Sequence, residues 1–538
     1  MKKIIFLFFA VSVLSLTACV DELNQMPHTE TTASDVYDSA SNYKSVLAKI
    51  YASYVITGQE KGGGKADIST TSGYDYLRCY FNMQECGTDE LACTWLEGDN
   101  VKNLSYLTWD SSDPWVSDTY YRIYQTIDYC NEFLRNATDD AISKFSESDQ
   151  TKIKHYRAEV RFLRALSYYH AMDLYRNIPF VTEKDKVGSF IPPRYTSDQI
   201  FDFIEKELKD IDGDLMDRSE AEYGRATKAA AWTLLAKMYL NAKVYTDTAR
   251  YTDCITYCKK VIADGYSLES DYSKLFNADN DKRTNEIIFP LCVDSKHTVS
   301  WGATTYLVCG EVDGSSTEKP ADYGVASAWS MFRIRGEVPA LFGTGDKRAM
   351  FYKDGQSRTL DTGLDVQKNG YLVTKWTNLT DLGTVASNTA SYGVNTDFPV
   401  FRLADVYLMY AESVLRGGAG GDKTTALNYV NALRERAYGN KDGDIRASDL
   451  TLDFILNERA RELYWECTRR TDLIRYNRFT TSDYLWQSFF LFLFSPSFPS
   501  NSYFYPLPST VPSPTPTFLT LFSSPPSFFL LFSCSYFS

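Results

Sequence analysis

Long segments whose apolar residues recur at spacings of three and four dominate this sequence and constrain its fold most. In residues 152–174, for example, Val160, Leu163, Ser167 and Leu174 fall on one face of a helix. Such stripes must be buried against one another, which predicts a mainly α fold. We expect helices at residues 35–56, 119–135, 152–174, 197–215, 226–240, 249–263, 401–416, 423–437 and 452–475.

Helix pairs joined by short turns, such as residues 226–240 and 249–263, are typical of a scaffold. Their arrangement resembles tetratricopeptide-type stacking, without a clean repeat signature. Residues 266–398 differ, because Gly, Thr, Asn, Asp and aromatic residues dominate there and helical periodicity is lost. We therefore expect a tetratricopeptide-like helix-pair scaffold with a loop-rich, short-strand ligand-binding insert. Short strands are expected at residues 286–290, 305–308 and 371–374.

Residues 1–18 have the layout of a lipoprotein signal peptide. Two lysines precede an apolar run over residues 4–16, which is too short to span a bilayer. The tripeptide at residues 16–18 then precedes Cys19, so that cleavage would leave this cysteine N-terminal and open to acylation. Acyl chains on Cys19 would anchor the folded chain to a membrane. The alternative is an ordinary signal peptide that happens to contain a cysteine.

Composition divides the rest of the chain into four segments. Residues 19–265 are expected to form the helical scaffold with an N-terminal ligand loop, and residues 266–398 the loop-rich binding region. Residues 399–486 would supply the C-terminal helices that complete the scaffold. Residues 487–538 are rich in Pro, Ser and Phe and contain no charged side chain, which is an aggregation hazard. We hypothesise that this tail results from a frameshift or a gene-prediction error.

Charge and histidine content exclude several functions. The chain has 56 Lys and Arg against 69 Asp and Glu, a net charge of −13, so no nucleic-acid partner is expected. With 4 histidines, multi-His metal sites and His-based triads are not expected. Cys79, Cys86 and Cys93 lack the spacing of a metal site, which leaves buried thiols or a disulfide. Cys254 and Cys258 share a helix face and are expected to pack as small apolar groups.

Three carboxylates follow one face of an arginine-rich helix near the C-terminus. Glu458, Glu462 and Glu466 are four residues apart, whereas a glycosidase needs two carboxyl groups facing each other across a cleft. We therefore expect structural ion pairs or a partner-facing surface, and no catalytic residues. His170 lies on an apolar helix stripe and is expected to be packed and hydrogen-bonded rather than to bind a ligand.

Three motifs occur in order along the chain. The first, AEVRFLRAL, begins at Ala158 and continues to LYRNIP at residues 174–179. The second, RLADVYLMYAE, covers residues 402–412. The third, NERAREL, covers residues 457–463 and is followed by TRRTDLIR. Together with the signal peptide, these motifs resemble the SusD/RagB family of nutrient-uptake lipoproteins of the outer membrane. The resemblance extends from the N-terminus to about Trp486.

The resemblance to starch-binding members of this family implies a ligand site. Trp95, Trp301 and Trp329 would form an aromatic arc that cradles a curved α-glucan, and Arg78 would donate hydrogen bonds to sugar hydroxyls. Tyr306 lies in a segment that matches the same members and is counted among the expected ligand-binding residues. The residues alone leave a second interpretation open, in which the three tryptophans belong to the core. Their polar, turn-rich flanks favour exposure.

The resemblance also implies a function. It describes a non-catalytic, lipid-anchored protein on the cell surface of the outer membrane. Such a protein captures oligosaccharide or polysaccharide, here favouring a starch-like α-glucan, and delivers it to a SusC-like TonB-dependent transporter. The acidic residues 20–22 resemble a surface-export signal. No cofactor is expected, and Asp279 and Asp281 match the family's calcium ligands only in part. The alternatives are a peptide-binding uptake lipoprotein of the same family, a glycoside hydrolase and a purely structural surface protein.

Overall fold

The computed structural model describes residues 33–60, 65–68, 74–188, 190–314, 318–360, 363–386 and 393–481. The predictions on the signal peptide, on lipidation of Cys19 and on the tail at residues 487–538 lie outside these ranges. Within them, none of the helices combines the length and the apolar character needed to cross a membrane.

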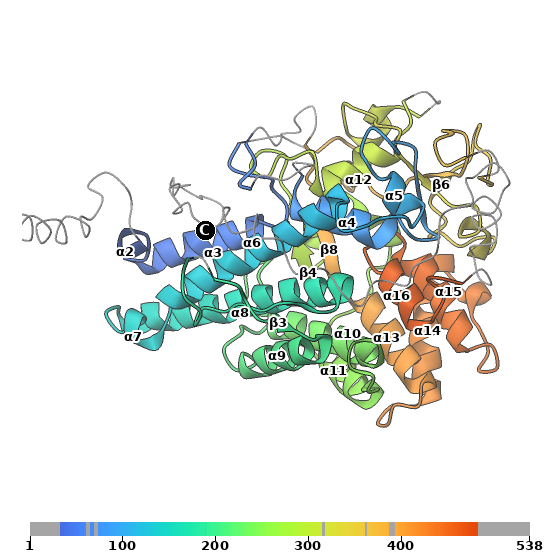
Figure 1. Ribbon diagram of the computed structural model, residues 1–538. Coiled ribbons are helices and arrows are strands. Elements are labelled where there is room, and N and C mark those ends of the chain that lie inside the picture. The colour runs from blue at the N-terminus through green and yellow to red at the C-terminus, as the bar shows by residue number, and fades with distance from the viewer. Residues whose placement is uncertain are drawn as a thin grey trace, which may run out of the picture.

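Long helices that lie side by side build most of the molecule (Figure 1). Helix α6 packs on α8, α8 on α9, α9 on α10, α10 on α11, α11 on α13, and α13 on α14. This sequential packing buries the apolar stripes and confirms the predicted mainly α, tetratricopeptide-like scaffold. The helices are α3 (Ala40–Ala52), α6 (Pro114–Asn136), α8 (Glu147–Tyr175), α9 (Ser197–Asp210), α10 (Lys228–Thr246), α11 (Tyr251–Ala263), α13 (Leu403–Leu415), α14 (Lys423–Tyr438), α15 (Leu452–Leu463) and α16 (Arg469–Arg475).

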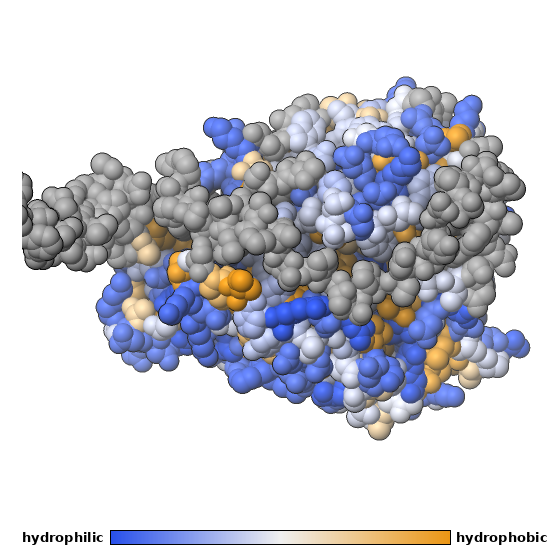
Figure 2. Space-filling view, in the orientation of Figure 1, coloured by the Kyte–Doolittle hydropathy of each residue, from blue (hydrophilic) through white to orange (hydrophobic). Residues whose placement is uncertain are grey.

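Shorter helices connect these elements or support the loops. The α-helical ones are α2 (Ala33–Val36), α4 (Tyr76–Glu85), α5 (Lys102–Ser105), α7 (Asp139–Ile142) and α12 (Ala303–Glu311). The 3₁₀ turns are η3 (Tyr272–Phe276), η4 (Asn280–Lys282), η5 (Pro320–Tyr323), η6 (Pro339–Leu341) and η7 (Lys441–Gly443). In the view of Figure 2, hydrophilic surface predominates and apolar surface is confined to separate patches.

Local capping residues set where several helices begin. Ser146 accepts a hydrogen bond from the backbone N–H of Asp149 at 3.2 Å and so starts α8. Helix α9 begins at Ser197 and is capped by Thr196, whose backbone N–H donates to Gln199 Oε1 at 3.0 Å. Such contacts satisfy N–H groups that have no partner within the helix.

The strands are short and form two-stranded antiparallel pairs. Strand β1 (Leu91–Cys93) pairs with β5 (Phe332–Ile334), with Cys93 opposite Phe332. The other pairs are β2 (Ile178–Pro179) with β3 (Arg194–Tyr195), β4 (Ile287–Leu291) with β8 (Phe398–Arg402), and β6 (Phe351–Tyr352) with β7 (Leu372–Val373). The strands predicted near residues 286–290 and 371–374 are thus present, within a residue or two at their ends.

The strand predicted at residues 305–308 is wrong, because this segment lies inside helix α12. Every residue of α12 is buried, so its apolar run carries neither a two-residue nor a 3.6-residue period. The single helix predicted at residues 452–475 is also divided, into α15 and α16. Trp465 and Cys467 between them have left-handed φ angles of 60° each, which end the first helix without a glycine to mark the position.

A buried network of arginines and glutamates joins α15 to α14 and to strand β8. Glu462 accepts hydrogen bonds from Arg402 Nη1 at 2.6 Å and from Arg348 Nη1 at 3.0 Å, and it also pairs with Arg436. Glu466 accepts from Arg402 Nε at 2.7 Å. These carboxylates therefore form structural ion pairs, as predicted from the sequence.

The histidine and cysteine side chains considered above belong to the core. His170 Nδ1 is 2.8 Å from the Tyr76 hydroxyl, and its ring stacks on Tyr80 with a centroid distance of 4.0 Å. Burial lowers the pKa of His170 to about 3. The nine cysteines of the described ranges are free thiols, and Cys254 Sγ lies 3.9 Å from Cys258 Sγ.

We predict that replacing Glu462 with Gln destabilises the protein by about 3 kcal/mol at neutral pH, because three guanidinium groups lose a buried counter-charge. Burial alone would raise the pKa of Glu462, but Arg436, Arg402 and Arg348 lower it to about 2. Its contribution is therefore present at neutral pH and is lost as the pH falls below about 4.5, the ordinary value, toward 2. Urea denaturation between pH 7 and pH 3 measures both effects.

The matched control for this experiment is Glu220→Gln, at an exposed turn position. It should leave stability nearly unchanged across the same pH range, since exposed charge pairs contribute little. A Glu462→Gln variant as stable as the Glu220→Gln variant would contradict the structural role of the network.

Candidate functional site

Three segments far apart in sequence meet at one edge of the helical scaffold. They are α4 with the loop after β1, the N-terminus of α12, and the loop before β5. The pairing of β1 with β5 holds the loop after β1 next to the loop before β5. The Thr94 backbone N–H extends this pairing by donating to Met331 O at 2.7 Å. The Thr94 hydroxyl also donates to Ser330 O at 2.7 Å. Trp95 and Trp329, the neighbours of Thr94 and Ser330, are thereby brought to the same edge.

The predicted tryptophans carry much of the aromatic surface there. The ring centroids of Trp301 and Trp329 are 6.1 Å apart with an interplanar angle of 45°, and Trp329 also lies 6.4 Å from the ring of Tyr306. Trp95 is 40% exposed, Trp301 is 39% exposed, and Trp329 is partly buried. The alternative in which these tryptophans fill the core is therefore excluded for Trp95 and Trp301.

The buried side chain of Arg78 on helix α4 joins the segment that carries Trp301 to the loop that carries Trp95. Its guanidinium lies between two aromatic rings, 3.4 Å from the centroid of Tyr74 and 3.9 Å from that of Tyr306. Nη1 donates to the backbone carbonyl of Trp301 at 2.6 Å, and Nη2 donates to Asp99 Oδ1 at 2.7 Å. The planar, forked group of arginine suits this combination of stacking and divided hydrogen bonding, which lysine cannot reproduce.

Asp99 is a positioning residue that the sequence indicates only as part of a polar flank. Its second carboxylate oxygen accepts from the Tyr306 hydroxyl at 3.3 Å, and that hydroxyl also donates to Asn82 Oδ1 at 2.9 Å. The backbone carbonyl of Asp99 accepts from the indole N–H of Trp115 at 2.9 Å. Asp99 therefore fixes the loop that carries Trp95 to helices α4, α6 and α12.

Asp75 performs a similar role at the start of α4 and is not found by sequence reasoning. Its carboxylate accepts from the Arg78 backbone N–H at 2.9 Å, from the Ser300 hydroxyl at 2.7 Å and from the Ala303 backbone N–H at 3.2 Å. A side chain at Gly302 would place its Cβ 1.7 Å from Asp75 Oδ2, so only glycine fits beside it. The Trp-Gly dipeptide at residues 301–302 is the one sequence signal of this close approach.

Backbone strain is also present around this surface. Three non-glycine residues there have left-handed φ angles: Asn100 at 55°, Ala303 at 46° and Ser330 at 55°. Each follows a segment that carries one of the tryptophans. Such conformations cost of order 1–3 kcal/mol and persist where the surroundings hold them, which is common at functional sites.

The remaining predicted site residues lie beneath the surface. Arg78 is 3% exposed and Tyr306 is fully buried, so both support the aromatic surface from below. Burial raises the pKa of Tyr306 well above its usual range, which keeps its hydroxyl a hydrogen-bond donor. Direct contact of either side chain with a sugar stays a prediction.

Asp279, one of the two aspartates considered for calcium, contacts protein groups through both carboxylate oxygens. Asp279 Oδ1 lies 2.8 Å from Lys282 Nζ, and Asp279 Oδ2 accepts from the Asp381 backbone N–H at 2.9 Å. Among the residues with described positions, no group of three or more His, Cys, Asp or Glu side chains could hold a metal ion. Calcium binding at Asp279 and Asp281, which the resemblance suggested in part, stays an untested prediction.

Taken together, the geometry provides flat, partly exposed indole rings on a rigid support, with polar groups at the edge. Among the latter, Lys102 Nζ donates to Glu97 Oε1 at 2.5 Å on the exposed loop after Trp95. Rings in this setting stack on flat apolar faces, while the polar edge can bind hydroxyl groups. The arrangement is suited to binding a ligand that presents both kinds of surface.

Comparison with known proteins gives consistent matches along the chain. A profile described as "SusD family" matches residues 233–490, and one described as "Starch-binding associating with outer membrane" matches residues 79–240. The starch-binding protein SusD of Bacteroides thetaiotaomicron is 31% identical, over 88% of this chain and 90% of that protein. The SusD-like protein P25 of Formosa agariphila is 29% identical, over 67% of this chain and 70% of that protein.

Solved structures share the fold. A SusD homologue from Bacteroides thetaiotaomicron superposes with a TM-score of 0.65 at 20% identity, covering 85% of this chain and 90% of that one. Surface glycan-binding protein A from the same organism, solved in complex with laminarihexaose, gives a TM-score of 0.62 at 18% identity. That match covers 81% of this chain and 90% of the other.

We predict that Arg78→Lys lowers stability by about 1–3 kcal/mol and alters tryptophan fluorescence, since lysine loses both the stacking and one of the two hydrogen bonds. The control is Arg446→Lys, whose side chain is 84% exposed beside Asp449 and should tolerate the change. Thermal denaturation and the emission maximum are measured for both variants. Identical behaviour of the two variants would show that Arg78 does not support the site.

Proposed function

Because the chain belongs to the SusD family, we propose that it is a glycan-binding protein of the outer membrane that captures oligosaccharides with Trp95, Trp301 and Trp329. The observation that carries the proposal is the pairing of partly exposed indoles, 6.1 Å apart, over a buried arginine that holds the backbone of one of them. Such a rigid platform reduces the conformational entropy that a ligand must offset.

The chemistry of a pyranose fits this platform. A sugar ring presents an apolar face of C–H groups and an equator of hydroxyls, so a flat indole binds the face and polar groups bind the rim. Each stacked ring contributes about 1 kcal/mol beyond simple burial. A few such contacts make a weak site, and several along a polymer add up through avidity.

We favour a starch-like α-glucan as ligand. The support is the 31% identity to a protein named for starch binding, which extends over 88% of the chain. The β1–β5 pairing brings the segments of Trp95 and Trp329 together, and the ring of Trp329 lies 6.1 Å from that of Trp301. A structural relative solved with laminarihexaose makes a β-glucan the appropriate comparison ligand in any assay.

Delivery to a TonB-dependent, SusC-like transporter is the second half of the proposal. Acylation of Cys19 would hold the protein at the outer membrane with its binding surface exposed on the cell. The helical scaffold would then face the transporter, and the loop-rich region would hold the ligand. Loading and release require an open and a closed arrangement of the two proteins, with the ligand favouring the closed one.

The proposal excludes hydrolysis by the carboxylates singled out in the sequence. Glu458 and Glu462 are fully buried, and Glu466 is 5% exposed. All three accept hydrogen bonds from arginine or lysine side chains. A glycosidase needs two carboxyl groups that face a substrate across an open cleft, which this buried network does not provide.

We predict that Trp95→Ala or Trp329→Ala weakens binding to amylose by at least about tenfold in affinity electrophoresis, because each removes a stacking ring. The control is Trp232→Ala on α10, whose ring lies beside Lys260 and whose indole N–H bonds to Asp212 outside the site. It should retain the mobility shift of the unmodified protein. Unchanged mobility shifts in both site variants would refute the arc.

We also predict that the purified protein releases no reducing ends from starch during prolonged incubation. A glycosidase of known activity serves as the positive control. Release of reducing sugar at a rate that rises with protein concentration would establish an enzyme instead. In that case the rate for the Trp95→Ala variant should fall in proportion to its loss of starch binding.

A further inference from the structure

The α4–β1 turn (residues 85–90) contains two buried glutamates that the aromatic surface does not use. Glu85 is the last residue of α4, and Glu90 directly precedes β1. Their exposed fractions are 0% and 1%. The turn lies between Arg78 on α4, which supports the candidate site, and Trp95, which follows β1. A change of charge at this turn can therefore affect how Trp95 is held.

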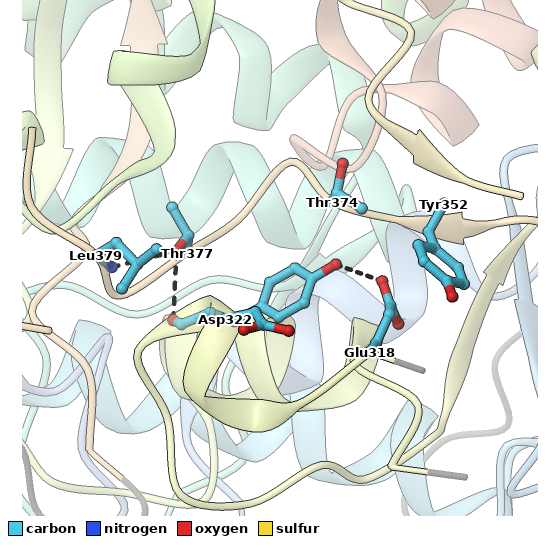
Figure 3. A pocket seen from close by; sticks show the side chains of 7 residues that line it. Glu318, Asp322, Tyr352, Thr374, Thr377 and Leu379 are labelled. Atoms are coloured by element: carbon cyan, nitrogen blue, oxygen red, sulfur yellow. Dashed lines mark hydrogen bonds between the residues drawn. The ribbon is translucent and has the colours of Figure 1, made fainter. Parts of the chain in front are cut away.

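Glu85 lacks the hydrogen-bond donors that a buried carboxylate needs. Neither of its side-chain oxygens has a hydrogen-bond partner of normal geometry among the residues that the structure describes. Glu318, which lines the pocket in Figure 3, shows the usual arrangement, because it accepts from the Tyr323 hydroxyl and from the Asp313 backbone N–H at 3.4 Å. Burying a charge without such partners is costly, so the neutral, protonated form of Glu85 is favoured.

The guanidinium group of Arg469 on α16 is divided among the carboxyl groups of this turn. Its Nε and Nη2 each lie 2.7 Å from a carboxylate oxygen of Asp89, and its Nε also lies 3.5 Å from Glu90 Oε1. The Trp465 backbone N–H donates to Glu90 Oε2 at 3.3 Å. Arg469 therefore forms its bidentate pair with Asp89, which leaves a weaker contact for Glu90 and no hydrogen bond for Glu85.

Two further cations reach this turn from neighbouring elements, and both make contacts elsewhere. Lys375 Nζ lies 2.6 Å from Glu466 Oε1. Arg335, which follows β5, interacts with the charge of Asp89, and its Nε donates to the Leu91 carbonyl at 2.9 Å. Neither cation forms a hydrogen bond with Glu85, so the cations at this turn do not neutralise all three of its carboxyl groups by direct contact.

The pKa values of the groups at this turn agree with the geometry. Burial, together with the charge of Glu90, raises the pKa of Glu85 well above its usual range. Burial raises the pKa of Glu90 to about 8, although Arg469 acts in the opposite direction. The thiols of Cys86 and Cys467 face Glu85, and burial raises the pKa of each well above its usual range. Both thiols therefore stay uncharged near neutral pH.

We propose that Glu85 and Glu90 together hold at least one proton in the folded protein at neutral pH, and that loss of this proton loosens the turn that leads to Trp95. In the protonated state Glu85 needs no cation, and Glu90 keeps its contacts with Trp465 and Arg469. With both groups charged, repulsion between two buried carboxylates strains the turn and the loop after β1. The consequence for ligand, which rests on the proposed function, is weaker glycan binding at alkaline pH.

The raised pKa values set the direction of the pH dependence. In the unfolded chain a glutamate releases its proton near the ordinary value of 4.5, whereas the folded chain retains the proton to a higher pH, about 8 for Glu90. The stabilising contribution of the proton is therefore complete below about pH 4.5 and is lost as the pH rises through 8.

The test compares Glu85→Gln and Glu90→Gln with the unmodified protein by urea denaturation at about pH 5, pH 7 and pH 9. Glutamine has the shape of a protonated glutamate but cannot ionise. Relative to the unmodified protein, we expect the ratio of folded to unfolded Glu85→Gln to rise at least about tenfold between pH 5 and pH 9. Glu90→Gln should change in the same direction. A constant or falling relative stability of both variants over this range would overturn the proposal.

Two controls make the same substitution where no proton is held. Glu220→Gln, at an exposed turn position, should match the unmodified protein at each pH. Glu462→Gln should be less stable by a constant amount over this range, because arginines lower the pKa of buried Glu462 to about 2 and it is ionised throughout. A pH dependence in both controls as large as that of Glu85→Gln would assign the effect to other groups and overturn the proposal.

Infrared spectroscopy detects the proton without unfolding the chain. At about pH 7 the absorption band of protonated carboxyl groups should be weaker in Glu85→Gln than in the unmodified protein, since the other buried carboxyl groups contribute equally to both spectra. Equal band intensity in the two proteins would overturn the proposal.

Amylose retention at about pH 6 and pH 9 measures the consequence for the aromatic surface. The unmodified protein should bind about threefold or more weakly at pH 9, and Glu85→Gln should bind equally at both pH values. An equal loss in both proteins would contradict the link between the turn and Trp95. An absence of retention at both pH values would instead overturn the proposed function, and the urea and infrared measurements would still decide whether the turn holds a proton.

Discussion

The buried guanidinium of Arg78 is the contact on which the candidate site depends. It stacks between Tyr74 and Tyr306 and binds both the Trp301 carbonyl and Asp99, so one side chain joins three segments that are distant in sequence. A charge with 3% exposure is stable only when its partners are fixed. Because these partners belong to the loops that carry the tryptophans, satisfying the charge also orients the exposed rings.

The helical scaffold supplies the rigidity that this arrangement needs. Sequential packing of α6, α8, α9, α10 and α11 buries the apolar stripes, and the arginine–glutamate network fastens α15 to the strand that leads into α13. Removing one member of such a network leaves its partners charged and buried, which destabilises the packing around them. Two groups of buried charges therefore support the loops. One is Arg78 with Asp99 at the site, and the other is the arginine–glutamate network in the scaffold.

Most of the long helices could be predicted from sequence because their apolar stripes follow the helical period, as at Val160, Leu163 and Leu174. Helix α12 could not, since all of its residues are buried and no period remains. The division between α15 and α16 depends on left-handed residues that carry ordinary side chains. At the site, resemblance indicated Trp95, Trp301 and Trp329. Asp75 and Asp99 also make contacts across more than 200 residues, as in the bond from Ser300 to Asp75, and no local pattern reveals those contacts.

The most direct measurement of the central claim is a crystal structure of the protein with maltoheptaose. The account predicts glucose rings stacked against the indoles of Trp301 and Trp329, with Trp95 against the same oligosaccharide and Arg78 still bound to the Trp301 carbonyl. An oligosaccharide bound at another surface, with these three indoles in contact with solvent alone, would contradict it.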